Sequence, residues 1–187
     1  MDSRTYDALA MLLTYPEDHR SREIGSPVII NGPPDTAAAE LAVFAEKMAP
    51  LSLHDRQELF IQTFDLSPVC ALEMGWHLFG ENYDRGLLLV KMRQQLRMYR
   101  LAETTELPDH LTNGLRLLAR MERNSGAYFA EAIVLPALEK MLDAIRGKNN
   151  PYERVLEAAR LFVHEDFPEL PAQLATPKRE PELRVLA

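Results

Sequence analysis

Apolar residues recur every three or four positions along most of the chain, which is the spacing of amphipathic helices. Pro16 and Pro50 each end such a stripe, and a Pro-rich stretch over residues 25–36 predicts a loop. No alternating pattern longer than a few residues predicts a strand. The stripes predict helices over about residues 4–14, 36–48, 52–64, 67–79, 84–101, 109–118, 127–146 and 150–163.

This pattern predicts an all-α fold, a single-domain helical bundle of about seven to nine helices over residues 1–167. Glycine is scarce, at 8 residues, and leucine and alanine dominate the apolar positions, which also favours helices. From Pro168 on, four prolines in fourteen residues and many charges predict a disordered tail over residues 168–187.

Particular residues mark where helices start, bend and end. Ser52, with Asp55 three residues on, is typical of a capping box. The pair Ser67-Pro68 places a capping hydroxyl before a proline and predicts the start of a further helix, which Gly80 is expected to end. Pro136 lies inside the stripe over residues 127–146 and is expected to kink that helix.

Composition narrows the class of protein. The 187 residues, 47% hydrophobic and 26% charged, suit one globular domain. No apolar run is long enough to predict a membrane span, and the N-terminus resembles no export signal. A net charge of −7 argues against a nucleic-acid partner. Cys70 is the single cysteine, which excludes an internal disulfide and suits the cytoplasm.

The familiar catalytic motifs are missing from the sequence. It contains no glycine-rich phosphate loop, no HExxH, no GxSxG and no Cys-x-x-Cys pair. Cys70 falls inside a predicted helix, where it is expected to be a small buried side chain. The run over residues 164–166, His-Glu-Asp, cannot converge on a metal from one helix, because adjacent residues point about 100° apart. His77 is either hydrogen-bonded to a neighbour or a polar group at the rim of a groove.

The segment ELPDHL, residues 106–111, gathers two carboxylates and a histidine around a proline. Pro108 biases Leu107 toward an extended backbone, and Asp109 can then cap the helix that follows. His110 would fall in the first turn, where the helix dipole disfavours its charged form. This interpretation explains Pro108 and Asp109, but it leaves Glu106 and His110 without a purpose.

Four segments taken together resemble one family: LLTYP at 12–16, FIQTFDLSP at 60–68, HLFGENYDRG at 77–86 and ELPDHL at 106–111. In this order and spacing they are similar to the NarJ branch of the NarJ/TorD/DmsD chaperones, which help molybdenum enzymes to mature. The resemblance covers roughly residues 6 to 165. Asn82-Tyr83 departs from the Ser-Arg type of pair usual in nitrate-reductase chaperones, which leaves the client open.

The resemblance implies an all-helical cytoplasmic chaperone with no turnover of its own and no stably bound cofactor. Such proteins bind the N-terminal leader of the catalytic subunit of a molybdopterin oxidoreductase. They hold that subunit until its bis(molybdopterin guanine dinucleotide) molybdenum cofactor, and often an iron–sulfur cluster, is inserted. Where the leader is a twin-arginine signal, they also delay export. The implied client is a nitrate reductase or a related periplasmic enzyme.

A leader of this kind is a basic segment followed by an apolar, helix-prone one, so it would need a groove with aromatic walls and carboxylates. Met74 could help such a groove adapt to different partners. The residues predicted to form the peptide-binding site are Phe60, Phe64, Asp65, Trp76, His77, Phe79, Glu81, Asp84, Arg85, Glu106, Pro108, Asp109 and His110. Phe64 and Phe79 are expected to belong partly to the core.

Two alternative functions stay open at this stage. One is a guanine-nucleotide-binding enzyme, whose phosphate site would have to be the helix start at Asp109. The other is a structural delta subunit that remains in the mature oxidoreductase. A homodimer is also left open by the sequence, and neither membrane insertion nor a nucleic-acid partner is expected.

Overall fold

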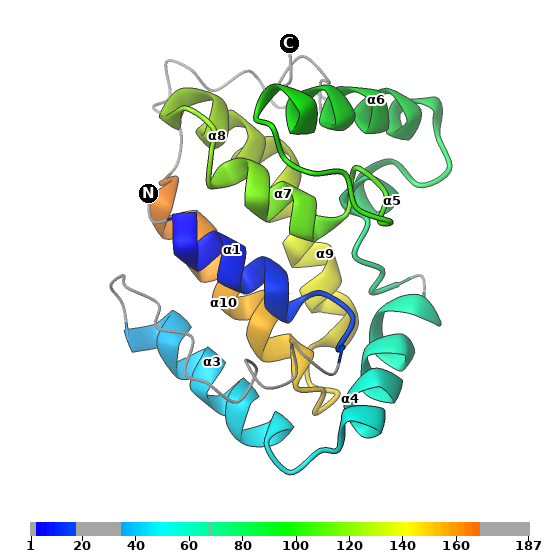
Figure 1. Ribbon diagram of the computed structural model, residues 1–187, viewed down its shortest axis with the longest axis vertical. Helices are drawn as coiled ribbons and strands as arrows, with labels where there is room; N and C mark the ends of the chain where they lie inside the picture. The colour runs from blue at the N-terminus through cyan, green and yellow to red at the C-terminus, as the bar shows by residue number, and fades with distance from the viewer. Residues whose placement is uncertain (1–2, 18–34, 68, 169–187) are drawn as a thin grey trace.

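The computed structural model describes residues 3–17, 35–67 and 69–168, and within these ranges it contains helices and no strand (Figure 1). The predicted all-α fold is therefore confirmed. Residues 169–187 of the predicted tail and residues 25–34 of the predicted loop lie outside the described residues. The helices are α1 (Ser3–Leu12), α3 (Asp35–Met48), α4 (Leu53–Phe60), α5 (Met74–Phe79), α6 (Tyr83–Met98), α7 (Leu111–Leu118), α8 (Arg123–Phe129), α9 (Leu135–Ile145) and α10 (Tyr152–Asp166), with π-helical segments η1 (Ile61–Asp65) and η2 (Ala130–Val134).

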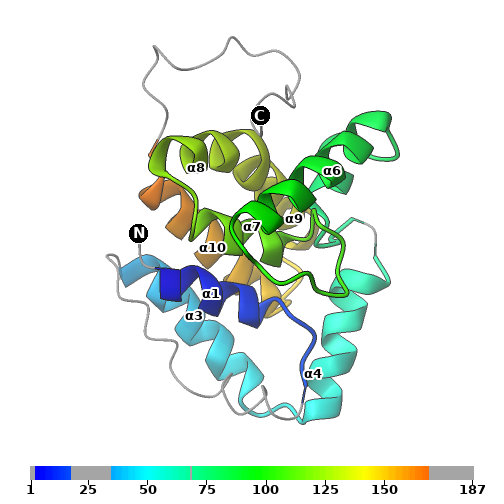
Figure 2. The same ribbon diagram turned by 45° about the horizontal axis from the view of Figure 1, so that its top comes forward.

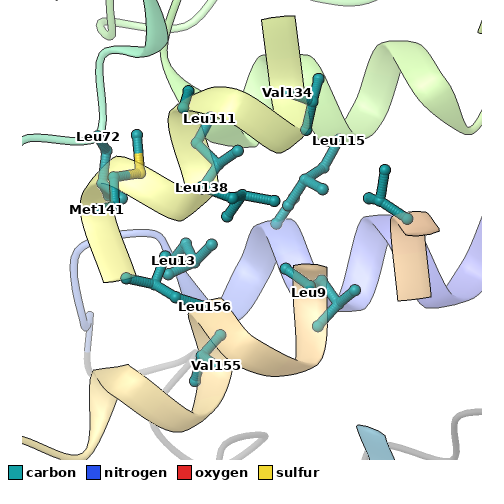
Figure 3. Packing of buried hydrophobic residues seen from close by; sticks show 14 of the residues in the cluster. Leu9, Leu13, Leu72, Leu111, Leu115, Val134, Leu138, Met141, Val155 and Leu156 are labelled. Carbon is teal, nitrogen blue, oxygen red and sulfur yellow. The ribbon is translucent and has the colours of Figure 1, made fainter. Parts of the chain in front are cut away.

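The core lies where α1, α7, α9 and α10 meet. Helix α10 packs against α3 and α9, and α1 packs against α7 (Figure 1). Figure 3 shows Leu9, Leu115, Leu138 and Leu156, one from each of these four helices, directed into a common apolar interior, and all four are fully buried. Because the helices are short, their stability comes from this shared burial more than from helix propensity.

The predicted capping box is present. The Ser52 hydroxyl accepts a hydrogen bond from the Asp55 backbone N–H at 3.2 Å, and the Asp55 carboxylate accepts one from the Ser52 N–H at 3.2 Å. Gly80 ends α5 with a φ of 59°, a backbone conformation that favours glycine. Pro136 is the second residue of α9, and the residue four positions earlier lies in η2. A π-helical turn therefore occupies the place where the proline was predicted to interrupt the helix.

The helix predicted to start at Ser67-Pro68 is wrong in its first half, because α5 begins only at Met74. The backbone of residues 72–74 pairs instead with residues 109–111. The Leu111 N–H donates to the Leu72 carbonyl at 2.8 Å, and the Met74 N–H donates to the Asp109 carbonyl at 2.9 Å. The Leu72 carbonyl and the Met74 N–H therefore make these hydrogen bonds in place of helical ones. Cys70 is buried as expected, but in the bend that precedes this bridge.

The π-helical segment η1 continues α4 and is tied to the start of α10 by one threonine. The Thr63 hydroxyl donates to the Leu59 carbonyl at 2.6 Å and accepts from the Asn150 amide at 2.7 Å. The Asn150 side chain also accepts from the Tyr152 N–H at 3.0 Å. The threonine therefore connects two segments that lie far apart in the sequence.

Replacing Thr63 with valine keeps the shape of the side chain but removes both hydrogen bonds. The free energy of unfolding is expected to fall by about 1–2 kcal/mol, because the partly buried Asn150 amide loses its acceptor. Urea denaturation measures this. Thr14→Val is the control, because it removes only a hydrogen bond from the Thr14 hydroxyl to the Ala10 carbonyl, four residues earlier in the chain. An equal loss in both variants would mean that the tie to α10 adds no stability.

Candidate functional site

An open groove with a volume of about 1180 Å³ runs along one side of the bundle. Three parts of the chain surround it. The first is the C-terminal half of α1 with the residues that follow, the second is the end of α4 with η1, and the third is the bridge between residues 72–74 and 109–111. Figure 2 shows α1 and α4 on either side of the chain that leaves α1, with α6 and the loop that follows it nearby. The groove is thus built from parts of the chain separated by more than half its length, from Asp7 to Arg120.

All four of the sequence segments that carry the family resemblance reach this groove. Each supplies at least one lining side chain, and the segment over residues 77–86 supplies only one. The lining residues from these segments are Leu13, Thr14 and Tyr15; Phe60, Phe64 and Asp65; Arg85; and Glu106 and His110. Residues that are distant in sequence therefore share one surface.

Aromatic rings form one wall of the groove. The Phe60 ring lies 5.8 Å from Tyr15 and 5.0 Å from Phe64, both in edge-to-face geometry. Phe60 and Phe64 are about 95% buried, and Tyr152 packs behind both rings at 5.8 and 4.9 Å. The wall is therefore an outer face of the core, as expected for Phe64, and its shape is fixed by packing.

Carboxylates outnumber arginines in the rest of the lining, by five to three. Asp65, Glu73 and Glu106 all reach the groove, whereas the Asp7 carboxylate is bound by both terminal nitrogens of Arg120 at 2.9 Å. Partial burial raises the pKa of Asp65 and of Glu73 above their ordinary values. A cationic ligand would offset that cost of burying negative charge, so the groove is suited to basic groups.

Asp109 lies behind the groove lining and is fully buried. Its carboxylate accepts a hydrogen bond from Arg85 Nε at 3.2 Å and one from the Gly75 N–H. The Arg85 guanidinium in turn lies 5.7 Å from the centre of the Trp76 ring, in cation–π geometry. Burial raises the pKa of Asp109, and the neighbouring Arg85 opposes that shift. Asp109 is therefore not the helix cap predicted from the sequence.

His110 takes the capping role instead. Its Nδ1 accepts a hydrogen bond from the Thr112 backbone N–H at 3.4 Å and lies 2.7 Å from the Thr112 hydroxyl. Because Nδ1 accepts, the ring proton sits on Nε2. Burial lowers the pKa of His110 to about 4, so the ring is neutral at pH 7. The cap also engages an N–H that a phosphate would need at the start of α7, which disfavours the nucleotide site.

Several residues predicted to line the site do not reach the groove. The half-buried His77 donates from Nε2 to the Ala71 carbonyl at 2.6 Å, which matches the hydrogen-bonded interpretation. Phe79 packs against the core because α5 lies against α9. Glu81 lies before α6 and Asp84 in its first turn, both away from the groove. Pro108 is buried, and Met74 is buried against Gly114. Asp109, as described above, faces Arg85.

Several other lining residues have no local signal in the sequence. Leu72 and Glu73 fall inside a predicted helix, but the bridge to residues 109–111 brings both to the groove. Arg116 of α7 and Arg120, two residues beyond the end of α7, reach it because α7 packs against α1. A pairing between elements so distant in sequence has no local signal.

Two kinds of feature are absent from the described residues. No group of three or more histidine, cysteine, aspartate or glutamate side chains is placed to hold a metal ion. No helix in the described part of the chain has the length and apolar character needed to cross a membrane. Burial also raises the pKa of the Cys70 thiol to about 11, which does not suit a nucleophile. Fold and site together define an all-α protein with an open groove of aromatic and acidic lining.

The chain is similar to the nitrate reductase molybdenum cofactor assembly chaperone NarJ of Escherichia coli strain K12 and to the protein of the same name from Escherichia coli O157:H7. Each is 26% identical to it over 121 residues, which is 62% of this chain and 51% of the relative. The chain thus spans about half the length of the curated relatives it matches. No family model matches it. The similarity confirms the resemblance to the NarJ branch.

Proposed function

We propose that this protein is a cytoplasmic chaperone for the catalytic subunit of a molybdopterin oxidoreductase of the nitrate-reductase type. It binds the N-terminal leader of that subunit in the groove. It holds the subunit while the molybdenum cofactor, and an iron–sulfur cluster where the client has one, is inserted before assembly or export. On this proposal it has no catalytic turnover and keeps no cofactor of its own.

The observation that carries the proposal is the convergence of the four family-like segments on one groove. The resemblance of these segments to the family is one of sequence alone, and a shared surface is the simplest reason for them to occur together. The printed name of the two relatives, a molybdenum cofactor assembly chaperone, supports the same role.

The lining also suits the expected ligand. A helix with an apolar face and basic flanks could place its leucines against the Phe60 and Phe64 wall and its cations near Asp65, Glu73 and Glu106. Each well-buried apolar anchor contributes about 1.5–3 kcal/mol. Three or four anchors are therefore enough for affinity in about the micromolar range after the ordering costs.

Reversing two groove charges tests the proposal. Asp65→Lys combined with Glu106→Lys is expected to weaken binding of the synthetic client leader by about tenfold, because both lysines would repel its basic residues. The measurement is isothermal titration calorimetry with the leader of a molybdopterin catalytic subunit from the same organism. The loss should shrink at high salt, since the two charges are exposed.

The matched control reverses two carboxylates that lie outside the groove. Glu81→Lys with Asp84→Lys makes the same change in net charge and should leave the affinity within about twofold of the wild type. If both double variants lost affinity equally, net charge and not the groove would govern binding. If the wild type did not bind the leader at all, the proposed function would fail.

A further inference from the structure

A position for a guanidinium group lies in the wall of the groove, between an indole ring and a buried carboxylate. We propose that Trp76, Gly75 and Asp109 form a guanidinium-binding seat, which Arg85 fills from within the chain and which an arginine of a bound peptide fills in its place. The inference rests on the proposed function for the source of that peptide, but not for the existence of the seat.

The hydrogen bonding of the seat is incomplete when Arg85 fills it. Arg85 reaches Asp109 Oδ2 through Nε at 3.2 Å, and Asp109 Oδ1 has no hydrogen-bond partner among the described residues although it is buried. A guanidinium can bind both oxygens of a carboxylate in parallel, and this paired geometry is the stronger one. An arginine entering from the groove can therefore make a contact that Arg85 leaves unmade.

The space for the seat depends on a glycine. A Cβ atom at Gly75 would lie 2.6 Å from Asp109 Oδ2 and 3.1 Å from Arg85 Cγ. Any other residue at this position would therefore push into both partners. The Gly75 N–H also donates to the Asp109 carboxylate, which fixes the direction of that side chain.

Exchange of Arg85 for another arginine is physically reasonable. Arg85 lies in the first part of α6, its side chain is 20% exposed, and it lines the groove, so it can turn toward solvent. Leaving Asp109 unpaired would be costly, because a buried charge without a partner is strongly destabilising. Replacing one guanidinium by another keeps the carboxylate paired in both the free and the bound state.

The first experiment asks whether the seat accepts guanidinium when Arg85 is shortened. Arg85→Ala opens the seat, and Arg85→Met removes the same charge but fills the space with an unbranched apolar chain. With guanidinium chloride at about ten times its Kd, the Tm of the alanine variant should rise by about 3–5 °C relative to that of the methionine variant, which reports the general denaturing effect of the salt. The methionine variant and the wild type should show no gain beyond that produced by equal NaCl. Equal responses of the two variants would overturn the seat.

The second experiment uses a leader peptide with arginines and the same peptide with lysines in their place. Arg85→Ala should bind the arginine peptide about fivefold more tightly than the wild type does, because the internal competitor is gone, and it should gain nothing for the lysine peptide. In the wild type, the NMR signal of the Arg85 Nε–H should shift on adding the arginine peptide. No shift, or weaker binding by the alanine variant, would mean that Arg85 is only a structural ion-pair partner.

The two experiments separate this inference from the proposed function. The guanidinium titration involves no peptide, so stabilisation of the alanine variant without leader binding would retain the seat and overturn the chaperone role. Leader binding without any response to guanidinium would retain the chaperone role and overturn the seat. Should the alanine variant fail to fold, the NMR measurement on the wild type still decides whether Arg85 is displaced.

Discussion

Replacing Tyr152 with alanine is expected to lower the free energy of unfolding by about 3–5 kcal/mol, which is the range for removing a large buried aromatic ring. Tyr152 is 1% exposed, and its ring lies 5.5 Å from Phe44 of α3 and 4.9 Å from Phe64 of η1. It thereby joins α10 to two other elements. Urea denaturation followed by circular dichroism measures the loss.

Tyr152→Phe is the control, because it keeps the ring and removes only the hydroxyl. Its stability should remain within about 1 kcal/mol of the wild type. Below its melting temperature the alanine variant should also bind the leader more weakly, since Phe60 and Phe64 rest against Tyr152. If the phenylalanine variant lost as much stability as the alanine variant, the hydroxyl and not ring packing would be responsible.

The helices were predictable where their signals are local. The stripe over residues 36–48 corresponds to α3 at Asp35–Met48, and the capping box at Ser52 starts α4 as expected. Both signals depend on residues three or four positions apart, which contact each other in any helix. The sequence therefore contains all that is needed to place these elements.

The segment before α5 could not be predicted in the same way. Ser67-Pro68 is a sound local start signal, but residues 72–74 pair with residues 109–111, more than thirty positions away. Tertiary pairing overrides local preference here. The same bridge brings Leu72 and Glu73 into the groove, so the error in the helix and the residues missed from the site have one cause.

The candidate site was predictable in residue type more than in arrangement. The motifs predict seven residues that do line the groove, while the part of these residues in binding stays a prediction. They are Phe60, Phe64, Asp65, Trp76, Arg85, Glu106 and His110. The cap of α7 was predicted at Asp109 instead of His110, because a proline before an aspartate is typical of a cap. The partner of Asp109, Arg85, lies 24 positions earlier, at a distance that no spacing rule covers.

Acidification is expected to destabilise the protein through His110. Burial lowers the pKa of His110 to about 4 in the folded state, whereas the ordinary value in the unfolded chain is 6.5. The unfolded chain therefore takes up a proton first as the pH falls, and stability that is present above pH 6.5 is lost toward pH 4. Between pH 7 and pH 5 this contribution amounts to about 2 kcal/mol.

His110→Asn isolates this contribution, because asparagine is a good helix cap that does not titrate. Denaturation at pH 7, 6 and 5 should show that wild-type stability falls by about 2 kcal/mol more than that of the variant. Burial raises the pKa of Glu73 and Asp109, which acts in the opposite direction but is common to both proteins. If His110→Asn kept the full wild-type dependence, His110 would not be the group that resists protonation, and its neutral ring could not be assumed in the groove.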